Sequence, residues 1–122
     1  MKVAIVGSRG FNEWRIIEAC IDRLVEKYGT ELTIVSGGAR GADSAGETIA
    51  IQRGVARIIH LPEWDKYGKS AGFRRNDLIV ADADMVLAFY APGPRSRGTS
   101  NTVASAKIAG KPVHVYHEGV WS

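Results

Sequence analysis

The chain has little of several features that would place it in a particular class of protein. It has a single cysteine, Cys20, so it can form neither an internal disulfide framework nor a zinc site built from cysteines. It has no long apolar run, and the short stretch VAIV near the start gives way at once to glycine and charge. That stretch is too short for a signal peptide or a membrane span. We therefore expect a cytoplasmic protein with no membrane partner.

The net charge is small as well. The 122 residues include 16 Lys and Arg against 13 Asp and Glu, a formal charge of +3. Hydrophobic residues make up 45% and charged residues 24% of the sequence, which is ordinary for a globular protein and argues against disorder. Neither a linker nor a low-complexity segment interrupts the chain, so residues 1–122 are expected to form one domain.

Short apolar runs alternate with segments of helical periodicity along the whole sequence. The runs predict strands at 2–6, 32–35, 55–61, 84–90 and 113–116, and the segments between them predict helices near 12–28, 42–53, 70–81 and 99–109. Trp14 falls on the apolar stripe of the first helix and is expected in the core, whereas the tail after Tyr116 has no clear assignment. This alternation predicts an α/β fold: a single doubly wound, mostly parallel, five-stranded Rossmann-like sheet with helices on both faces.

Positive charge gathers in the loops that run from strand to helix. Ligands of such sheets bind at the carboxyl ends of the strands, and eight of the 16 basic residues lie in or beside these loops. A phosphorylated small molecule or a nucleic-acid backbone is the natural partner of such a rim, although any single residue in it could simply be solvated. The eight are Arg9, Arg40, Lys66, Lys69, Arg74, Arg75, Arg95 and Arg97.

The loop SGGARGAD, residues 36–43, contains three glycines where a strand turns into a helix. Glycines there let the backbone approach a ligand and direct N–H groups at it, and the helix that follows adds unpaired N–H groups. Arg40 is placed to contact a phosphate. A tight turn alone would also explain the glycines. Asp43 is ambiguous, because it can stabilise the first helical turn, accept ribose hydroxyls or hold an arginine.

Several other sites are disfavoured by spacing. Neither a Walker A loop nor a G-x-G-x-x-G follows a strand, and the second strand ends in Ser36 rather than in an acid for a ribose. The three histidines lack the pattern of a metal site, so neither a metal nor a required cofactor is expected. Ser8 and Ser36 lack a nucleophile elbow and fit better as donors to phosphate. Trp64 and Tyr67 could stack on a base or pack at a subunit interface.

Taken in order, the motifs VGSR, VSGGARGAD, WDKYGKSAGFRRN, ADADMVLAF and RGTSN resemble the SLOG superfamily, and in particular its small phage and bacterial branch of YspA/YpsA-related domains. The resemblance runs from Val3 to about Tyr116. It implies a Rossmann-like fold that binds nucleotides or nucleotide-derived signals. Relatives in the superfamily include the Lonely Guy phosphoribohydrolases and recombination mediators that bind single-stranded DNA.

The resemblance also implies roles for individual residues. Arg75 matches the catalytic arginine of the hydrolases, and Gly98-Thr99 matches their Gly-Thr, with Thr99 capping a helix that receives phosphate. The hydrolases continue with glutamates where this chain has Ser100 and Asn101. The ligand-binding residues expected from loops and resemblance together are Gly7, Ser8, Arg9, Ser36, Gly37, Gly38, Arg40, Gly41, Asp43, Arg75, Asn76, Gly98, Thr99, Ser100 and Asn101.

Three functions remain open at this point. The first is non-catalytic binding of a nucleotide or nucleotide-derived phosphate ligand by a sensor, carrier or sequestering module. The second is a nucleoside 5′-monophosphate phosphoribohydrolase, with Arg75 and Asp43 as its catalytic candidates. The third is a binder of single-stranded nucleic acid. The resemblance further implies a homodimer formed through the third predicted helix, with Phe73, Leu78 and Ile79 as interface candidates.

Overall fold

Strand β1, Lys2–Gly7, lies inside a six-stranded sheet, and its residues Val3–Val6 are at most 4% exposed in the computed structural model, which describes residues 1–122. The other strands are β2 (Thr33–Ser36), β3 (Ala56–Ile59), β4 (Met85–Tyr90), β5 (Val113–His117) and β6 (Val120–Trp121). Their order is β3-β2-β1-β4-β5-β6, and every pair is parallel except β5 and β6. The predicted α/β class and mostly parallel sheet are confirmed, but the predicted number of five strands is wrong.

The sixth strand forms because the tail folds back on β5. Glu118 and Gly119 have φ of 52° and 79°, the positive values that a two-residue hairpin turn requires. The hairpin pairs Tyr116 with Trp121. The Trp121 ring then packs edge-on against Phe89 and Tyr116, with ring centroids 5.6 Å and 5.3 Å apart. This aromatic contact holds the segment that had no clear assignment from the sequence.

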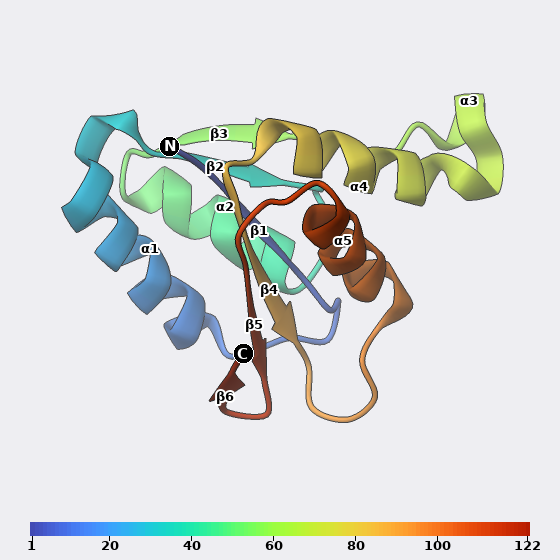
Figure 1. Ribbon diagram of the computed structural model, residues 1–122. Coiled ribbons are helices and arrows are strands. Elements are labelled where there is room, and N and C mark those ends of the chain that lie inside the picture. Colours follow the sequence, from blue (N-terminus) through green and yellow to red (C-terminus); the bar gives the residue numbers. More distant parts are fainter.

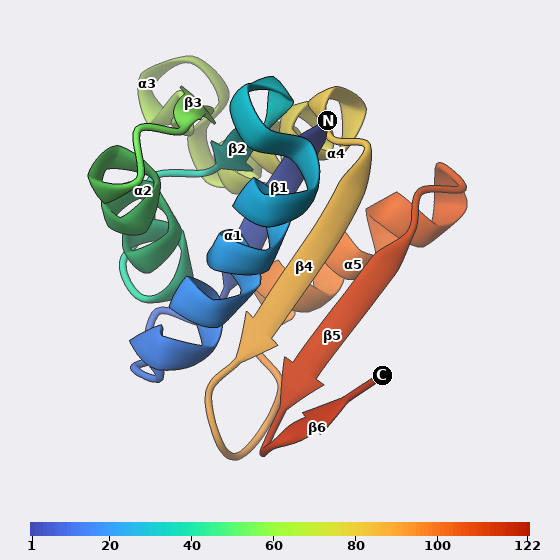
Figure 2. The ribbon, with the colours of Figure 1, turned by 90° about the vertical axis from the view of Figure 1, so that its left-hand side faces the viewer.

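Two pairs of helices cover the two faces of the sheet (Figure 1). Helices α1 (Trp14–Tyr28) and α2 (Ala42–Gln52) lie on one face, and α4 (Ala71–Asp82) and α5 (Arg97–Ile108) lie on the other. The view in Figure 2 shows α1 in front of β1 and α2 to its left, with α5 behind β4 and β5. A four-residue helix, α3 (Trp64–Tyr67), interrupts the long connection from β3 to α4, where only a loop was expected.

Small side chains bring α2 close to the sheet. A Cβ at Gly46 would lie 2.9 Å from the side chain of Ile5 on β1, so the helix packs at a distance that only glycine permits there. On α1 the buried stripe begins at Ile17. Trp14, expected in the core, is instead 41% exposed, because it is the first residue of the helix and precedes that stripe. Phe11 fills the core near this point, with its ring 5.5 Å from that of Phe89.

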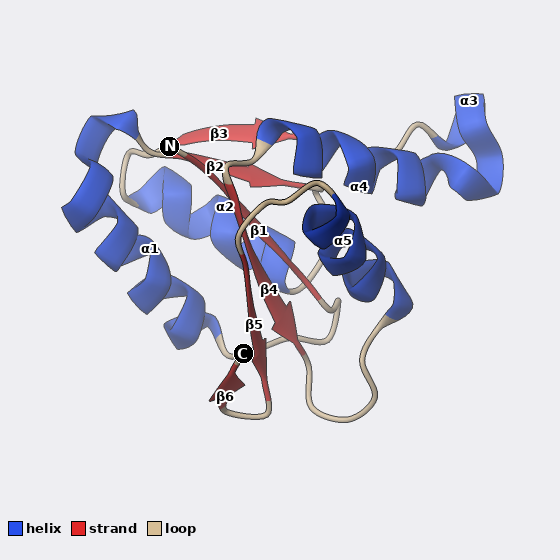
Figure 3. Cartoon of the chain, in the orientation of Figure 1, coloured by secondary structure: helices blue, strands red, loops and turns tan.

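The direction of the chain across the sheet reverses between β1 and β4. From β1 the chain moves outward through β2 to β3, and it then returns to β4 on the opposite side of β1. The carboxyl ends of β1 and β4 therefore lie side by side, joined by the bond from the Ser8 N–H to the Phe89 carbonyl (2.9 Å). In Figure 3 the loops that leave these ends are drawn in tan. Ligands of doubly wound sheets bind at such a reversal.

No helix of this chain combines the length and the apolar character needed to pass through a membrane.

Candidate functional site

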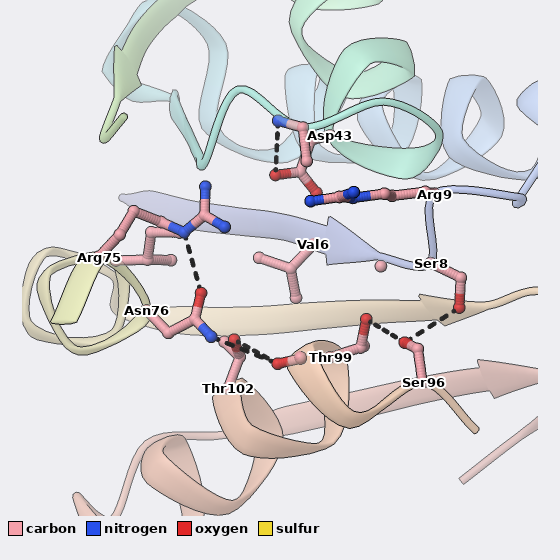
Figure 4. A pocket seen from close by; sticks show the side chains of 13 residues that line it. Val6, Ser8, Arg9, Asp43, Arg75, Asn76, Ser96, Thr99 and Thr102 are labelled. Carbon is pink, nitrogen blue, oxygen red and sulfur yellow. Dashed lines mark hydrogen bonds between the residues drawn. The ribbon is translucent and has the colours of Figure 1, made fainter. Parts of the chain in front are cut away.

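A cavity of about 280 Å³ lies at the carboxyl ends of β1 and β4 (Figure 4). Four segments that are distant in the sequence form its walls: the end of β1, the loop into α2, the middle of α4 and the start of α5. Polar and charged side chains outnumber apolar ones among the residues that line it. These residues are Val6, Gly7, Ser8, Arg9, Ala39, Asp43, Arg75, Asn76, Ile79, Ser96, Gly98, Thr99 and Thr102.

A chain of three hydroxyl groups runs along one wall of the cavity. Ser96 Oγ donates to Thr99 Oγ1 at 2.8 Å, so the hydroxyl of Ser8, 3.3 Å from Ser96 Oγ, is left to donate to Ser96. Ser8 Oγ also accepts the N–H of Ala91 (3.1 Å). The chain ends at Thr99, whose hydroxyl oxygen accepts the Ser96 hydrogen and whose own hydroxyl hydrogen is not used within this chain of hydroxyls. Because Thr99 lines the cavity, this hydrogen is available to a ligand.

Helix α5 begins two residues earlier than predicted. Ser96, not Thr99, is its N-cap, and Thr99 lies inside the first turn and is 6% exposed. The Ser96 side chain makes no capping bond to the backbone, and its hydroxyl donates to Thr99. The N–H groups of Arg97, Gly98 and Thr99 lie in the first turn, where no intrahelical acceptor exists. Gly98 and Thr99 of this turn also line the cavity, and the start of a helix, with its free N–H groups and the positive end of its dipole, suits an anion.

Arg75 and Asn76, both on α4, form the opposite wall. Arg75 Nε donates to Asn76 Oδ1 (3.0 Å), and Arg75 Nη1 donates to the carbonyl oxygen of Gly37. Asn76 in turn donates to Asn101 Oδ1 (3.1 Å) and to the Gly98 carbonyl (3.3 Å). Partial burial lowers the pKa of Arg75, and the nearby Asp43 carboxylate counteracts that shift. The guanidinium is thus held in place with its remaining N–H groups available.

Asp43 is the one acidic residue that lines the cavity, and it is 4% exposed. Its Oδ2 accepts the N–H groups of Gly37 (3.0 Å) and Ala39 (3.4 Å). Burial raises the pKa of Asp43 to about 6, although these bonds and Arg75 act in the opposite direction. The amides of the glycine loop that were expected to face a ligand are therefore taken, at Gly37 and Ala39, by a carboxylate of the protein itself.

The glycines at the site have different structural reasons. A Cβ at Gly7 would overlap the Phe89 carbonyl, and a Cβ at Gly41, where φ is 80°, would overlap the Ser8 carbonyl. Both positions therefore need glycine for the close approach of two backbone segments. Gly98 differs, because nothing lies within 4 Å of the Cβ it lacks and its φ is not positive. The fold does not require glycine at Gly98, yet this residue borders the cavity.

The remaining expected residues lie around the cavity rather than in it. Gly37, Gly38 and Arg40 line an adjoining groove. Ser36 donates to Glu47, and Ser100 shares a bond of 2.8 Å with the Tyr90 hydroxyl. Sequence reasoning did not name as ligand-binding five residues that line the cavity, of which Ser96 had a recognisable signal as a preferred N-cap residue. The five are Val6, Ala39, Ile79, Ser96 and Thr102.

Comparison with known proteins places the chain in a family. Residues 1–67 match the YspA, cpYpsA-related SLOG family. The chain is 39% identical over 120 residues to the Gene 61 protein of Mycobacterium phage D29, a match that covers 92% of this chain and 93% of the phage protein.

The chain is more distantly similar to the DNA processing protein DprA. The chain is 34% identical over 93 residues to DprA of Streptococcus pneumoniae, a match that covers 75% of this chain but only 32% of DprA. The structure of Helicobacter pylori DprA, described for its single-stranded DNA binding mode, superimposes with a TM-score of 0.74 at 21% identity and covers 94% of this chain and 64% of that one. At that identity the superposition shows a shared fold.

Proposed function

The chain belongs to the YspA, cpYpsA-related SLOG family, and from the geometry of its cavity we propose that it binds the phosphate group of a nucleotide or a nucleotide-derived ligand there, without turning it over. Such a protein would act as a sensor, a carrier or a sequestering module. No cofactor is needed for this function.

One observation carries the proposal: Gly98 and Thr99, in the first turn of α5, line a cavity that two arginines also border. Arg9 and Arg75 supply positive charge, and the Thr99 hydroxyl supplies a further donor. Backbone amides at a helix start, combined with guanidinium groups, are well suited to phosphate oxygens. Asp43 supplies the only opposing charge in the lining.

The direct test is to identify what the protein binds. Purified protein is denatured and any released nucleotide is identified by mass spectrometry, after which calorimetry measures the affinity of that nucleotide for Gly98→Ala and wild-type protein. We expect the variant to lose affinity because its added methyl group enters the cavity at the phosphate. Equal affinity in the two proteins would contradict a phosphate at this turn.

Hydrolysis of an N-glycosidic bond is less well supported by the residues. A carboxylate near the sugar normally stabilises the developing positive charge or orients water. At the start of α5 the chain has Ser100 and Asn101, and neither lines the cavity. Asp43 is the one candidate carboxylate, and its Oδ2 already accepts two backbone bonds. Incubation with each common nucleoside monophosphate is expected to yield no free base. Release that disappears in Asp43→Asn would establish the hydrolase instead.

A nucleotide phosphate can also belong to a single strand of nucleic acid. The similarity to DprA favours this second candidate, since the H. pylori protein is described by its binding of single-stranded DNA. This chain spans about a third of S. pneumoniae DprA, so the similarity concerns only a part of that protein. Affinity that rises with oligonucleotide length and falls steeply with salt would distinguish the strand from a free nucleotide.

A homodimer remains a prediction of the family resemblance. Phe73 and Leu78 on α4 are 48% and 54% exposed and are available for an interface, whereas Ile79 is 1% exposed and belongs to the core. Sedimentation of wild type and Leu78→Glu over a range of micromolar concentrations tests the pairing. We expect a dimer that the substitution dissociates, and a wild-type monomer at every concentration would contradict it.

A further inference from the structure

The cavity is not closed on the side of the glycine loop. Beyond Arg9 and Arg75 it continues into a second hollow of about 440 Å³, which shares both residues with the cavity. This hollow, called here the Trp64 groove, lies between the segment 37–40 and the segment 61–64. A third hollow of about 630 Å³ follows it, and these two share Leu61, Pro62 and Arg75.

The lining of the Trp64 groove carries charge of one sign. Arg9, Arg40 and Arg75 border it, and no acidic side chain does. The overall sequence is nearly balanced, with 16 basic and 13 acidic residues, so three arginines without a carboxylate are a local concentration. A groove of this kind attracts a polyanion and tracks its backbone.

The same groove exposes large apolar side chains. Trp64 is 53% exposed and Leu61 is 65% exposed. The Trp64 ring has a defined place, because its edge lies 3.6 Å from the position that a Cβ on Gly72 would take. Next along the path, the Arg74 guanidinium lies 4.3 Å from the centre of the Tyr67 ring. Tyr67 is half-buried, so Trp64 is the exposed aromatic ring of this path. Arginines beside an exposed aromatic ring form the pattern on which a base of a single strand stacks while its phosphates are neutralised.

We propose that the Trp64 groove binds the nucleotides of a single-stranded nucleic acid that continue from the phosphate held in the cavity, with one base stacked on Trp64. This inference rests on the proposed phosphate site and adds to it a second subsite, a ligand class and a base platform. The Trp64 groove beside the cavity favours a strand over a free nucleotide, because a single nucleotide would leave the groove beyond Arg75 unused. The third hollow, which Glu63 and Asp77 also line, is not part of the proposed path.

The test compares two tryptophans of similar exposure. A fluorescein-labelled oligothymidylate of about twelve nucleotides serves as the probe, its length chosen within the usual site sizes for single strands. Trp64→Ala is expected to weaken its binding by about 5- to 150-fold, the usual cost of losing one stacked base. Trp64→Phe is expected to retain most of the affinity. Trp14→Ala, which removes a ring that is 41% exposed on α1 outside the groove, should leave it unchanged.

Thymidine monophosphate distinguishes the groove from the cavity. Its affinity is expected to be the same in Trp64→Ala as in wild type, whereas Gly98→Ala should weaken both the mononucleotide and the oligonucleotide. Two results would contradict strand binding in the Trp64 groove and leave the proposed phosphate site intact. One is an oligonucleotide affinity that Trp64→Ala does not change, and the other is a wild-type protein that binds the mononucleotide but no oligonucleotide. If wild-type protein binds neither probe, the phosphate site falls together with the groove.

Discussion

Two strand-to-helix turns at the same edge of the sheet were both expected to hold an anion, and they are built in opposite ways. In the turn from β2 to α2, the N–H groups of Gly37 and Ala39 donate to the Asp43 carboxylate of the protein. In the turn from β4 to α5, the hydroxyls of Ser96 and Thr99 bond to each other, the side chain of the N-cap Ser96 makes no bond to the first helical N–H groups, and Gly98 and Thr99 line the cavity.

The difference shows that a glycine in such a turn can have either of two structural explanations. Gly41 is needed because two backbone segments touch there, so its presence reports on packing. Gly98 has open space beside it, so the fold gives no reason for it. A glycine that the fold does not need, at the border of a cavity, is the stronger indication of a ligand. The predictions below test this distinction, from the largest expected effect to the smallest.

Gly41→Ala is expected to lower the free energy of unfolding by about 3 kcal/mol or more, since its Cβ would meet the Ser8 carbonyl at a positive φ. Gly54→Ala is the matched control, with φ of 68° and open space around it, and it should cost only about 1 kcal/mol. Urea denaturation measures both. Equal losses would mean that φ, and not the contact with Ser8, is the reason for glycine at Gly41.

Asp43→Asn tests the turn from β2 to α2, in which the Asp43 carboxylate accepts the loop N–H groups. The folded pKa of about 6 lies above the ordinary value of 3.8, so the native state holds this proton more tightly than the unfolded state. The contribution of Asp43 to the free energy of unfolding is fully present below pH 3.8 and is lost as the pH rises to about 6. Asparagine stays neutral, so the variant should be about 2–3 kcal/mol more stable than wild type at pH 7.

Denaturation at a series of pH values from 4 to 7 measures this effect. In Asp43→Asn the fall in stability between pH 4 and 6 should disappear, whereas Asp65→Asn, at an exposed carboxylate on α3, should leave the profile unchanged. Loss of the negative charge should also raise the affinity for a nucleotide roughly tenfold if phosphate lies beside it. A fall in nucleotide affinity would instead indicate that Asp43 accepts ribose hydroxyls.

Gly98→Ala tests the turn from β4 to α5. The substitution should leave the free energy of unfolding unchanged or raise it by up to about 1 kcal/mol, because alanine favours the helix more than glycine does. Nucleotide affinity should fall by at least about tenfold, as the methyl group displaces phosphate from the N–H groups. A variant that binds nucleotide normally would contradict the proposed difference between the two turns, since the turn from β4 to α5 would then hold no ligand.

Ser8→Ala is expected to have the smallest effect. It removes the acceptor of the Ala91 N–H and the start of the hydroxyl chain, at a cost of about 1 kcal/mol in stability and a few-fold in nucleotide affinity. Ser44→Ala on α2, whose side chain does not line the cavity, is the control. An unchanged affinity in Ser8→Ala would show that the hydroxyl chain does not orient Thr99 toward the ligand.

Sequence reasoning predicted most of the fold because its strongest signals are local. The run of buried residues at Val3–Val6 and the helical period of Ile17, Ile21 and Leu24 each indicate their own element. Trp14 was misplaced because it is the first residue of α1 and precedes the buried stripe. The tail was missed for another reason, since its place depends on a neighbour that is distant in sequence. The sixth strand requires Phe89 and Tyr116 to receive Trp121, and no local pattern contains that contact.

The candidate site was less predictable than the fold. Loop position directed attention to Ser8, Arg75 and Gly98, and the structure places all three around one cavity. It could not show that Asp43 turns back onto Gly37, because a carboxylate in a first helical turn has several possible partners. Nor could it show that Arg75 reaches the Gly37 carbonyl across 38 residues of sequence.

The cavity is assembled from residues 6–9, 39–43, 75–79 and 96–102, which meet only when the sheet is complete. A ligand held by all four segments binds the folded chain and not the unfolded one. Mass action then stabilises the native state by about 2.7 kcal/mol at a ligand concentration one hundred times Kd. For a domain of this size that gain corresponds to a rise in Tm of roughly 10 °C. A melting experiment run across a panel of nucleotides and short oligonucleotides would therefore rank candidate ligands without any assay of activity.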